Sequence, residues 1–465
     1  MNLKILIKNS FFIFLTNIVS IFSGIYLSVI VARNLGPDSF GTFSFILSFT
    51  GLFLFACDWG LGLLIMNRVS KDKSIVKQYI NNAIPSVLVL SLTVSVIVYA
   101  VMAFLGYPSL VLKGIIIGFV IVLITTLTGL FRGAFYAYEK MEYETITNST
   151  DKLGAIVFVS IAVLYSNGIV AILVAYLLSK LLSITICVVL YKTKIEKINP
   201  KIDFKYTVNL IKDALPFGLN IMLSALYIQS DISLISFIKG DHDVGLYRAA
   251  NGIILNLPII ALMVNNSIYP AMVSRNEDKK FIKNACEQSI RLVLLIGLPV
   301  TLFIFLFSDK IISILYGKEY VGAAIVLMVL SIALPLKLIS NSLATTLTSI
   351  NRQIDRTRII AIASGFSIIV NLILIHMFGY IGAGITAFLT EIVIFVFLLR
   401  SINEHISIEG LLKPFIISVP VFISLFLFKK VNEIFVLVAV VIYTSYCIYL
   451  IFVKYLKTRW KTVRI

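Results

Sequence analysis

Eight ionisable side chains lie inside long apolar runs of the sequence. Four are acidic and four are basic: Asp58, Asp151, Asp231, Glu391, Lys152, Lys180, Arg248 and Lys337. A charge in hydrocarbon is expensive, so such groups normally face a bundle interior or a watery cavity. These residues are therefore the first candidates for function.

The basic members suit an anionic substrate, because arginine makes forked contacts to phosphate and lysine provides a point charge. Those predicted to contact substrate are Arg248, Lys337 and Lys152. Ion coupling or charge pairing is predicted for Asp231, Asp58, Glu391 and Lys180. The main alternative is a set of salt bridges within each half of the chain, for example between Asp151 and a nearby lysine.

Uncharged polar residues follow the helical repeat in two of these runs. One stripe contains Asn220, Ser224, Tyr227 and Asp231; the other contains Lys337, Asn341, Thr345 and Thr348. Spacings of three and four place such residues on one helix face. We predict Asn220, Ser224 and Asn341 as further substrate contacts in a polar cavity. The alternative is that these residues hold helices together by hydrogen bonds.

The elements that must position these residues are membrane-spanning helices. The 465 residues are 59% hydrophobic and only 14% charged, whereas a soluble domain carries about 25% charged residues. Continuous apolar runs of about 20 residues exclude a barrel and predict an all-α, polytopic membrane protein. We expect about fourteen spans, at 10–32, 43–66, 81–106, 110–131, 146–166, 168–191, 213–237, 246–270, 290–308, 321–348, 359–377, 380–400, 412–428 and 434–453.

The net charge of +17 is distributed in short clusters between these runs. With the N-terminus in the cytoplasm, 29 of the 40 Lys and Arg residues fall in inner segments and 7 in outer ones. This is the positive-inside pattern, not a nucleic-acid-binding surface, and it predicts that both termini are cytoplasmic. We expect no nucleic acid among the partners.

Motifs for catalysis or cofactors are weak or missing. No phosphate-binding loop of the G-x-x-x-x-G-K-[ST] type occurs, and the four cysteines have no metal-ligand or disulfide spacing. Asp241-His242-Asp243 superficially resembles a D-x-D metal motif, but its predicted turn is very short. We predict no cofactor, no metal and no enzymatic activity.

The chain repeats itself weakly with an offset of about 205–212 residues. The segment 168–180 aligns without gaps on 379–391, and the turn ending Gly41-Thr42-Phe43 matches the one ending Gly245-Leu246-Tyr247. The predicted organisation is a six-helix bundle at 1–200, a second at 201–403, and two extra helices at 404–465. Parallel repeats of this kind hold substrate between the halves, and we expect Pro258, Pro299 and Pro335 to interrupt their spans.

Several segments resemble one family of polysaccharide exporters. Residues 32–43, A-R-N-L-G-P-D-S-F-G-T-F, resemble its A-R-x-L-G-P-x-x-[YF]-G-x-[FY] turn. Looser matches include 129–141, 215–231, 244–250 and Asn371 with 379–383. Across residues 10 to 400 the chain thus resembles the Wzx-type O-antigen or capsule flippases of the multidrug/oligosaccharidyl-lipid/polysaccharide exporter superfamily.

This resemblance implies a flippase of the bacterial plasma membrane. Its cargo would be undecaprenyl-diphosphate-linked oligosaccharide, carried to the outer leaflet by alternating access with proton or ion antiport. Membrane lipid and polysaccharide polymerase machinery are the implied partners, and Arg248 lies in a family-like motif. Two alternatives are a cation-coupled multidrug exporter of the same superfamily, and a membrane polymerase or glycosyltransferase.

Overall fold

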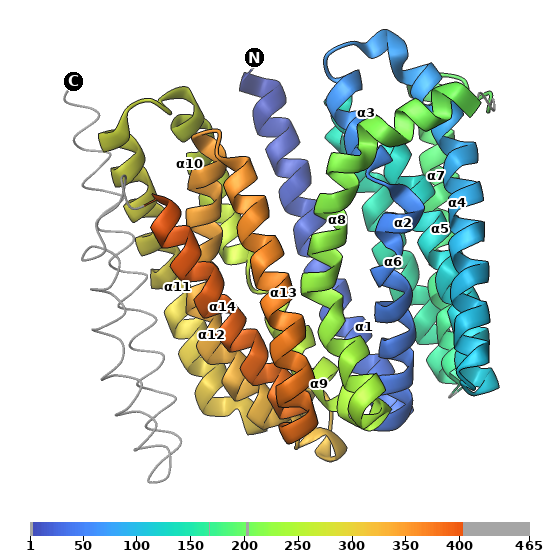
Figure 1. The fold of residues 1–465 in the computed structure, drawn as a ribbon, viewed down its shortest axis with the longest axis vertical. Coiled ribbons are helices and arrows are strands. Elements are labelled where there is room, and N and C mark those ends of the chain that lie inside the picture. Colours follow the sequence, from blue (N-terminus) through green and yellow to red (C-terminus); the bar gives the residue numbers. More distant parts are fainter. Residues whose placement is uncertain (1–2, 167, 201–203, 403–465) are drawn as a thin grey trace. The chain divides into compact units, whose positions relative to one another are not determined.

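The computed structural model describes residues 3–166, 168–200 and 204–402. These residues divide into two compact units, unit 1 (residues 1–249) and unit 2 (residues 250–465), and each unit is described by itself. The boundary between the two units lies inside one helix, α9, and not near residue 200. The predicted boundary of the sequence repeat at residue 200 stays a prediction. Figure 1 shows the helices in chain order.

Every regular element in the described residues is helical. The helices of unit 1 are α1 (Leu3–Leu52), α2 (Leu54–Asp58), α3 (Leu61–Val69), η1 (Lys73–Ile75), α4 (Val76–Phe104), α5 (Ser109–Ala137), α6 (Met141–Tyr165), α7 (Ile169–Lys194) and α8 (Phe204–Lys239). Helix α9 (Asp241–Ile254) begins in unit 1 and ends in unit 2. Unit 2 continues with α10 (Ile259–Ser274), α11 (Lys279–Leu315), η2 (Lys318–Tyr320), α12 (Ala323–Ser349), α13 (Gln353–Phe378) and α14 (Tyr380–Ile402).

The predicted all-α membrane fold is confirmed. Eleven segments in the described part of the chain are long and apolar enough to cross a membrane, and the first, Phe11–Asp58, contains two predicted spans. The first twelve predicted spans therefore each correspond to helix. The last two, 412–428 and 434–453, lie outside the described residues.

The first two spans are separated by a turn at Gly36. Its φ of +70° and ψ of 170° interrupt α1, and glycine adopts this backbone conformation without a steric penalty. Pro37 follows and restarts the helix, since its fixed φ suits the first helical turn. The predicted turn is thus a sharp interruption and not a longer loop.

The second and eighth predicted spans are both broken in mid-membrane. The second is divided at Phe53 and again at Trp59–Gly60, where both residues have positive φ. The eighth is divided between α9 and α10 at residues 255–258, and Pro258 precedes α10. Helices α11 and α12 instead continue through Pro299 and Pro335, so the predicted interruptions there were wrong.

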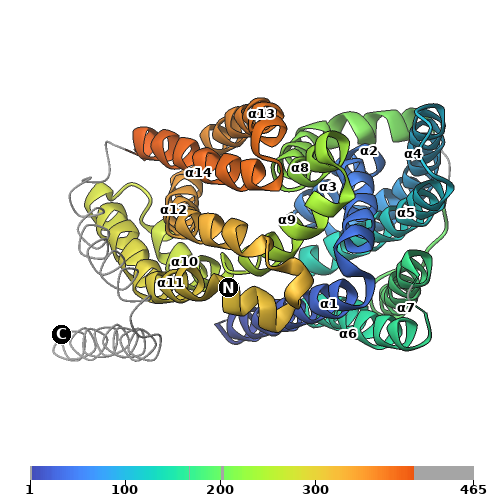
Figure 2. The same ribbon diagram turned by 90° about the horizontal axis from the view of Figure 1, so that it is seen from below.

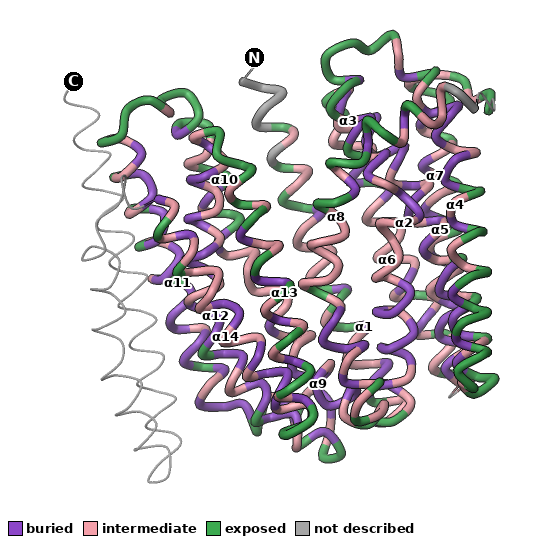
Figure 3. The backbone as a smooth tube through the Cα atoms, in the orientation of Figure 1, coloured by how far each residue is buried: buried purple, intermediate pink, exposed green. Residues whose placement is uncertain are grey.

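The core of unit 1 lies among α3, α4, α5, α7 and α8. Fully buried members include Leu64, Ile80, Phe135 and Tyr191, and Ala214 joins them from α8. Figure 2 shows α6 beside α7, which agrees with their packing contact. Helix α4 is exposed along one side in Figure 3. Its exposed residues are apolar, for example Leu92 and Val96, as expected for a face in contact with lipid.

The core of unit 2 lies mainly between α11, α12 and α14. Leu294, Leu343 and Leu398 belong to it and are almost completely buried. A polar link lies beside this apolar core: the Ser289 hydroxyl donates to Asn265 Oδ1 at 2.6 Å. Ser342 donates to the same oxygen at 3.1 Å. This link joins α10, α11 and α12 through residues that lie outside the two predicted polar stripes.

Candidate functional site

Unit 1 contains an ion-paired cluster between α6 and α7. Lys180 Nζ lies 2.8 Å from Asp151 Oδ2, and Lys152 Nζ lies 4.0 Å from the same oxygen. One carboxylate is therefore shared by two lysines. Asp151 and Lys180 therefore form the kind of salt bridge within one half of the chain that was considered as the alternative.

The cluster continues to a second ion pair on α5 and α6. The Arg132 guanidinium donates to a Glu144 carboxylate that is almost completely buried, and Lys152 interacts electrostatically with Arg132. Thr16 on α1 also donates to Glu144, at 3.4 Å. Sequence reasoning placed Arg132 in an inner loop and did not single out Glu144. The sequence feature that could have indicated this pair is the position of Arg132 and Glu144 on either side of the very short turn between α5 and α6.

The five residues Arg132, Glu144, Asp151, Lys152 and Lys180 form what we call the unit 1 cluster. Three of its side chains are basic and two are acidic, so the cluster carries a surplus positive charge. The side chain of Lys152 is 35% exposed, whereas that of Asp151 is 13% exposed. The Arg132 side chain is 34% exposed, so Lys152 and Arg132 are the cluster's most accessible charges, and an anion is the ligand that would complete it.

Arg248 and Asp231 lie on α9 and α8 of unit 1. Tyr176 on α7 interacts electrostatically with both Arg248 and Asp151 of the unit 1 cluster. Arg248 on α9 interacts electrostatically with Tyr176 of α7 and is partly exposed. Asp231 on α8 is buried, and its Oδ2 accepts a hydrogen bond from the Tyr247 hydroxyl at 2.8 Å. Arg248 thus interacts with Tyr176, and Asp231 has a structural hydrogen-bond partner in Tyr247.

Asp58 occupies the broken region of the second span. Its side chain is buried at the end of α2, and its Oδ1 accepts a long hydrogen bond of 3.4 Å from the backbone N–H of Gly62. A carboxylate there satisfies a donor at the start of α3. The structure brings Asp58 together with a helix terminus and not with the unit 1 cluster.

In the described part of unit 2, an ion pair joins two membrane-spanning helices. Lys337 Nζ on α12 lies 3.4 Å from Glu391 Oε1 on α14. The Glu391 side chain is 5% exposed and that of Lys337 is 26% exposed. Lys337 was predicted to contact substrate, and Glu391 to couple ions or pair with another charge; the structure places the two together.

The polar stripes on α8 and α12 satisfy their hydrogen bonds largely within their own helices. Ser224 donates to the Asn220 carbonyl at 2.9 Å, and Asn341 donates to the Lys337 carbonyl at 2.9 Å. Thr345 donates to the Asn341 carbonyl at 2.8 Å. These bonds do not join helices, in contrast to Ser289 with Asn265, so the stripes remain candidates for a polar surface.

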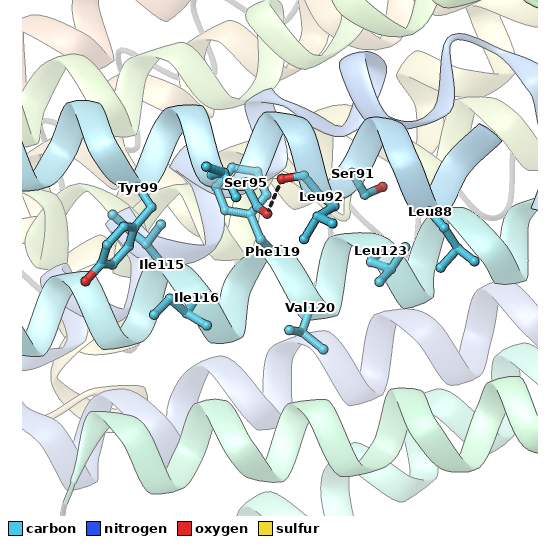
Figure 4. Close-up of a pocket in the computed structure, with 11 residues that line it drawn as sticks. Leu88, Ser91, Leu92, Ser95, Tyr99, Ile115, Ile116, Phe119, Val120 and Leu123 are labelled. Atoms are coloured by element: carbon cyan, nitrogen blue, oxygen red, sulfur yellow. Dashed lines mark hydrogen bonds between the residues drawn. The ribbon is translucent and has the colours of Figure 1, made fainter. Parts of the chain in front are cut away.

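The described residues also form an apolar groove of about 520 Å³ between α4 and α5. Figure 4 shows it lined by Leu88, Leu92 and Tyr99 on one helix, and by Ile116 and Val120 on the other. The Ser95 hydroxyl donates to its own helix, at the Leu92 carbonyl. The groove has no charged lining residue, so it is not a site for an anionic headgroup.

No three His, Cys, Asp or Glu side chains converge as a metal site among the residues that the structure describes. Asp241 and His242 instead bond to other side chains: Asp241 accepts from Thr42 and Ser236, and His242 pairs with Asp38.

Comparison of the sequence with models of known protein families identifies the family of this chain. The model of the polysaccharide biosynthesis protein family matches residues 6–276, more than half of the chain. The chain belongs to this family. The model of a second family, MatE, also matches residues 216–377.

Two curated relatives cover most of this family member. The Haloferax volcanii protein named "Probable low-salt glycan biosynthesis flippase Agl15" is 24% identical over 81% of this chain and 79% of its own length. The Staphylococcus aureus protein named "Capsular polysaccharide biosynthesis protein CapF" is 22% identical over 83% of this chain and 97% of its own length.

A solved structure supports the fold of the family member. The lipid II flippase MurJ, in an inward closed conformation, matches with a TM-score of 0.77 at 16% identity, over 94% of this chain and 98% of that chain. At this identity the match shows a shared fold and carries no assignment of substrate. It confirms a multi-pass membrane transporter fold.

Proposed function

We propose that the protein is a flippase that moves lipid-linked oligosaccharide repeat units across the membrane for surface polysaccharide biosynthesis. The cargo is an oligosaccharide on undecaprenyl diphosphate, which passes from the cytoplasmic to the outer leaflet by alternating access. The observation that carries this proposal is the surplus positive charge of the unit 1 cluster, in a member of the polysaccharide biosynthesis family. The named relatives act in glycan and capsule synthesis.

The cargo combines an anionic diphosphate with a hydrocarbon tail and neutral sugars. Lys152 and Arg248 in unit 1, and Lys337 in unit 2, are the proposed contacts for the diphosphate during its passage. Asn220, Ser224 and Asn341 are the proposed contacts for sugar hydroxyls. Asp231, Asp58, Glu391 and Lys180 hold these charges in place or couple transport to an ion gradient.

The proposed location is the bacterial plasma membrane, with both termini in the cytoplasm. The distribution of Lys and Arg supports this orientation, since 29 of 40 fall in the segments assigned inside. The proposed partners are the lipid-linked cargo, membrane lipid and the polymerase machinery that uses the flipped product. The protein acts as a transporter and not as a catalyst.

Cells that lack the chain provide the direct test. We expect polyprenyl-diphosphate oligosaccharide to accumulate on the cytoplasmic leaflet and surface polymer to be lost, as measured by mass spectrometry with leaflet-specific glycosidase digestion. Expression of the wild-type chain restores export. Normal levels of the lipid-linked intermediates in these cells would contradict the proposal.

Lys152→Gln tests the surplus charge directly. Because Asp151 keeps Lys180 as its closer partner, its carboxylate remains in an ion pair. A charge-assisted hydrogen bond contributes about 1.5–3 kcal/mol, so we expect export to fall about 10- to 100-fold while the thermal midpoint stays near that of the wild type. Lys152→Arg is the matched control and should retain most activity. Full export by Lys152→Gln would exclude this lysine as a substrate contact.

A second candidate is a cation-coupled multidrug exporter, which the match of the MatE model to residues 216–377 favours. Its site would attract cations, whereas the unit 1 cluster is basic. The same deletion strain distinguishes the two functions. Increased sensitivity to cationic drugs with unchanged lipid-linked intermediates would favour the exporter.

A further inference from the structure

The apolar groove between α4 and α5 lies on a surface of unit 1 that faces lipid. Its outermost side chains are apolar and accessible: Leu92 is 67% exposed and Ile116 is 50% exposed. Of its polar members, Ser91 is almost completely buried, and the Ser95 hydroxyl donates to a carbonyl of its own helix. The groove therefore offers contact with hydrocarbon and little hydrogen bonding, which suits an alkyl chain.

The length of the groove matches one leaflet of a bilayer. Figure 4 shows Tyr99 and Ile115 at one end of the groove, and Leu88 and Leu123 at the other. At a rise of about 1.5 Å per residue, Leu88 and Tyr99 lie about 16 Å apart along α4. Half of the hydrocarbon core of a bilayer is about 15 Å thick. A single acyl chain of a phospholipid would thus extend from one end of the groove to the other.

A lysine lies beyond the groove on α5, one helical turn from Ile116. Lys113, Ile116 and Val120 are separated by three and four residues, so they share one face of this helix. Lys113 is exposed, and it forms no ion pair with any residue that the structure describes. A lysine near the end of a spanning helix extends its ammonium to the level of the lipid headgroups. This charge therefore lies where a phosphate would lie if its acyl chain occupied the groove.

The end of the groove near Lys113 is the outer end under the predicted orientation. Helix α4 then runs outward and α5 runs inward, so the turn between Phe104 and Ser109 is on the outer side. Because the outer segments hold 7 of the 40 Lys and Arg residues, the positive-inside pattern does not account for a lysine at this place. Tyr99 lies at the same end, and tyrosine is enriched at membrane–water interfaces.

We propose that the groove between α4 and α5, together with Lys113, binds an anionic phospholipid of the outer leaflet. One acyl chain lies in the groove, and Lys113 Nζ pairs with the phosphate beyond its end. An anionic headgroup is favoured over a zwitterionic one, because the cation of a zwitterionic headgroup offsets the attraction of the lysine for phosphate. This phospholipid site rests on the membrane-spanning fold and not on the proposed flippase function.

Photo-crosslinking tests the phospholipid site in the full chain. The probe is phosphatidylglycerol with a diazirine on one acyl chain, present at a low mole fraction in phosphatidylcholine vesicles, and labelled peptides are identified by mass spectrometry. We expect residues 88–99 and 115–123 to be labelled several times more than the exposed apolar side of α13, which includes Ile369 and Ile373. Equal labelling of the groove and α13 would overturn the proposal, because the groove would then hold bulk lipid.

Lys113→Gln removes the charge and leaves the groove intact. We expect labelling of the groove to fall about fivefold, which is the effect of one lysine near an anionic membrane surface. Lys318→Gln on η2 is the matched control, because Lys318 is an exposed lysine of another predicted outer segment. Its labelling pattern should equal that of the wild type. Unchanged labelling in Lys113→Gln would exclude the lysine as the phosphate contact and overturn the site as proposed.

Ser95→Phe fills the groove and leaves the charge in place. We expect labelling of residues 88–99 to fall to the level of α13. Thr93→Phe is the matched control, because the Thr93 hydroxyl also donates to its own helix but the residue does not line the groove. Full labelling in Ser95→Phe would place the acyl chain outside the groove. The thermal midpoint of each variant, measured without the probe, shows whether it has folded.

Two other occupants are distinguished by further arms of the experiment. Displacement of the probe by unlabelled polyprenyl diphosphate, but not by unlabelled phosphatidylglycerol, would assign the groove to the proposed cargo. Disulfide formation between two copies of a Leu92→Cys chain, in a background without native cysteines, would assign it to self-association. Either result overturns the phospholipid site and leaves the flippase function standing. Normal lipid-linked intermediates in the deletion strain would instead overturn the flippase function and leave the phospholipid site standing.

Discussion

Positions 180 and 391 correspond in the internal repeat, and each forms an ion pair within its own unit. In unit 1 the residue is Lys180, bonded to Asp151 on α6. In unit 2 it is Glu391, which faces Lys337 on α12. The repeated helices thus carry opposite charges at matching places, and their partners come from helices that do not correspond.

The surroundings of the two pairs differ in charge. Lys337 and Glu391 form a one-to-one pair, whereas the unit 1 cluster has three basic and two acidic side chains. Repetition of a backbone therefore does not require repetition of its electrostatics. The unit 1 cluster thus has a net positive formal charge, whereas the formal charges of Lys337 and Glu391 cancel.

Asp151→Asn should produce the largest effect on stability. Its removal leaves Lys152 and Lys180 facing each other with Arg132 nearby. Loss of one partner of a buried ion pair costs about 3–5 kcal/mol, so we expect a strongly lowered thermal midpoint, measured by circular dichroism in detergent. Asp151→Glu should retain most stability. A midpoint for Asp151→Asn equal to that of the wild type would break the distinction between the two units.

Glu391→Gln should lower stability less, because it removes the carboxylate partner of one lysine, Lys337, and not of two. We expect a loss of about 2 kcal/mol in the free energy of unfolding. The double variant Lys337→Met with Glu391→Leu removes both charges and should recover most of this loss in the same measurement.

The double variant also separates stability from substrate binding in unit 2. If Lys337 contacts the diphosphate, the variant should be stable and yet export less lipid-linked oligosaccharide. Wild-type export by the double variant would restrict substrate charge recognition to unit 1. If the double variant does not recover stability, the Lys337–Glu391 pair stabilises the fold beyond the mutual compensation of its two charges.

The smallest effects are expected at uncharged links, where the two units should behave alike. Thr16 donates to Thr145 at 2.9 Å in unit 1, and Ser289 donates to Asn265 at 2.6 Å in unit 2. Such bonds between membrane helices contribute about 0.6 kcal/mol. Thr16→Val and Ser289→Ala should each lower the thermal midpoint slightly and to a similar extent. A large loss at only one site would extend the asymmetry to neutral groups.

Hydropathy alone predicted the helices well, since each of the first twelve spans corresponds to helix. It failed at helix ends. The fourth span was predicted to end at residue 131, but α5 continues to Ala137 and so includes Arg132. Arginine at the edge of an apolar run reads as part of a cytoplasmic loop, which is why the Arg132–Glu144 pair was missed.

Pairing was predictable in kind but not in detail. A salt bridge of Asp151 with a lysine was anticipated, but the choice of Lys180 depends on how α6 and α7 are rotated about their axes. The proline predictions failed at Pro299 and Pro335 because neighbouring helices and local adjustments satisfy the freed backbone groups. Of the three predicted interruptions, the one at Pro258 lies next to a break between two helices.

The hydroxyl groups on α8 and α12 that donate to carbonyls of their own helices affect which sugars the protein can carry. Ser224 and Thr345 each give their proton to a carbonyl of their own helix, and each oxygen still has capacity to accept. The serine and threonine hydroxyls of this surface are therefore acceptors, and donation to a ligand is left to the asparagine amides. Sugars that differ in the configuration of their hydroxyl groups would all find these acceptors, which favours permissive transport over stereochemical discrimination.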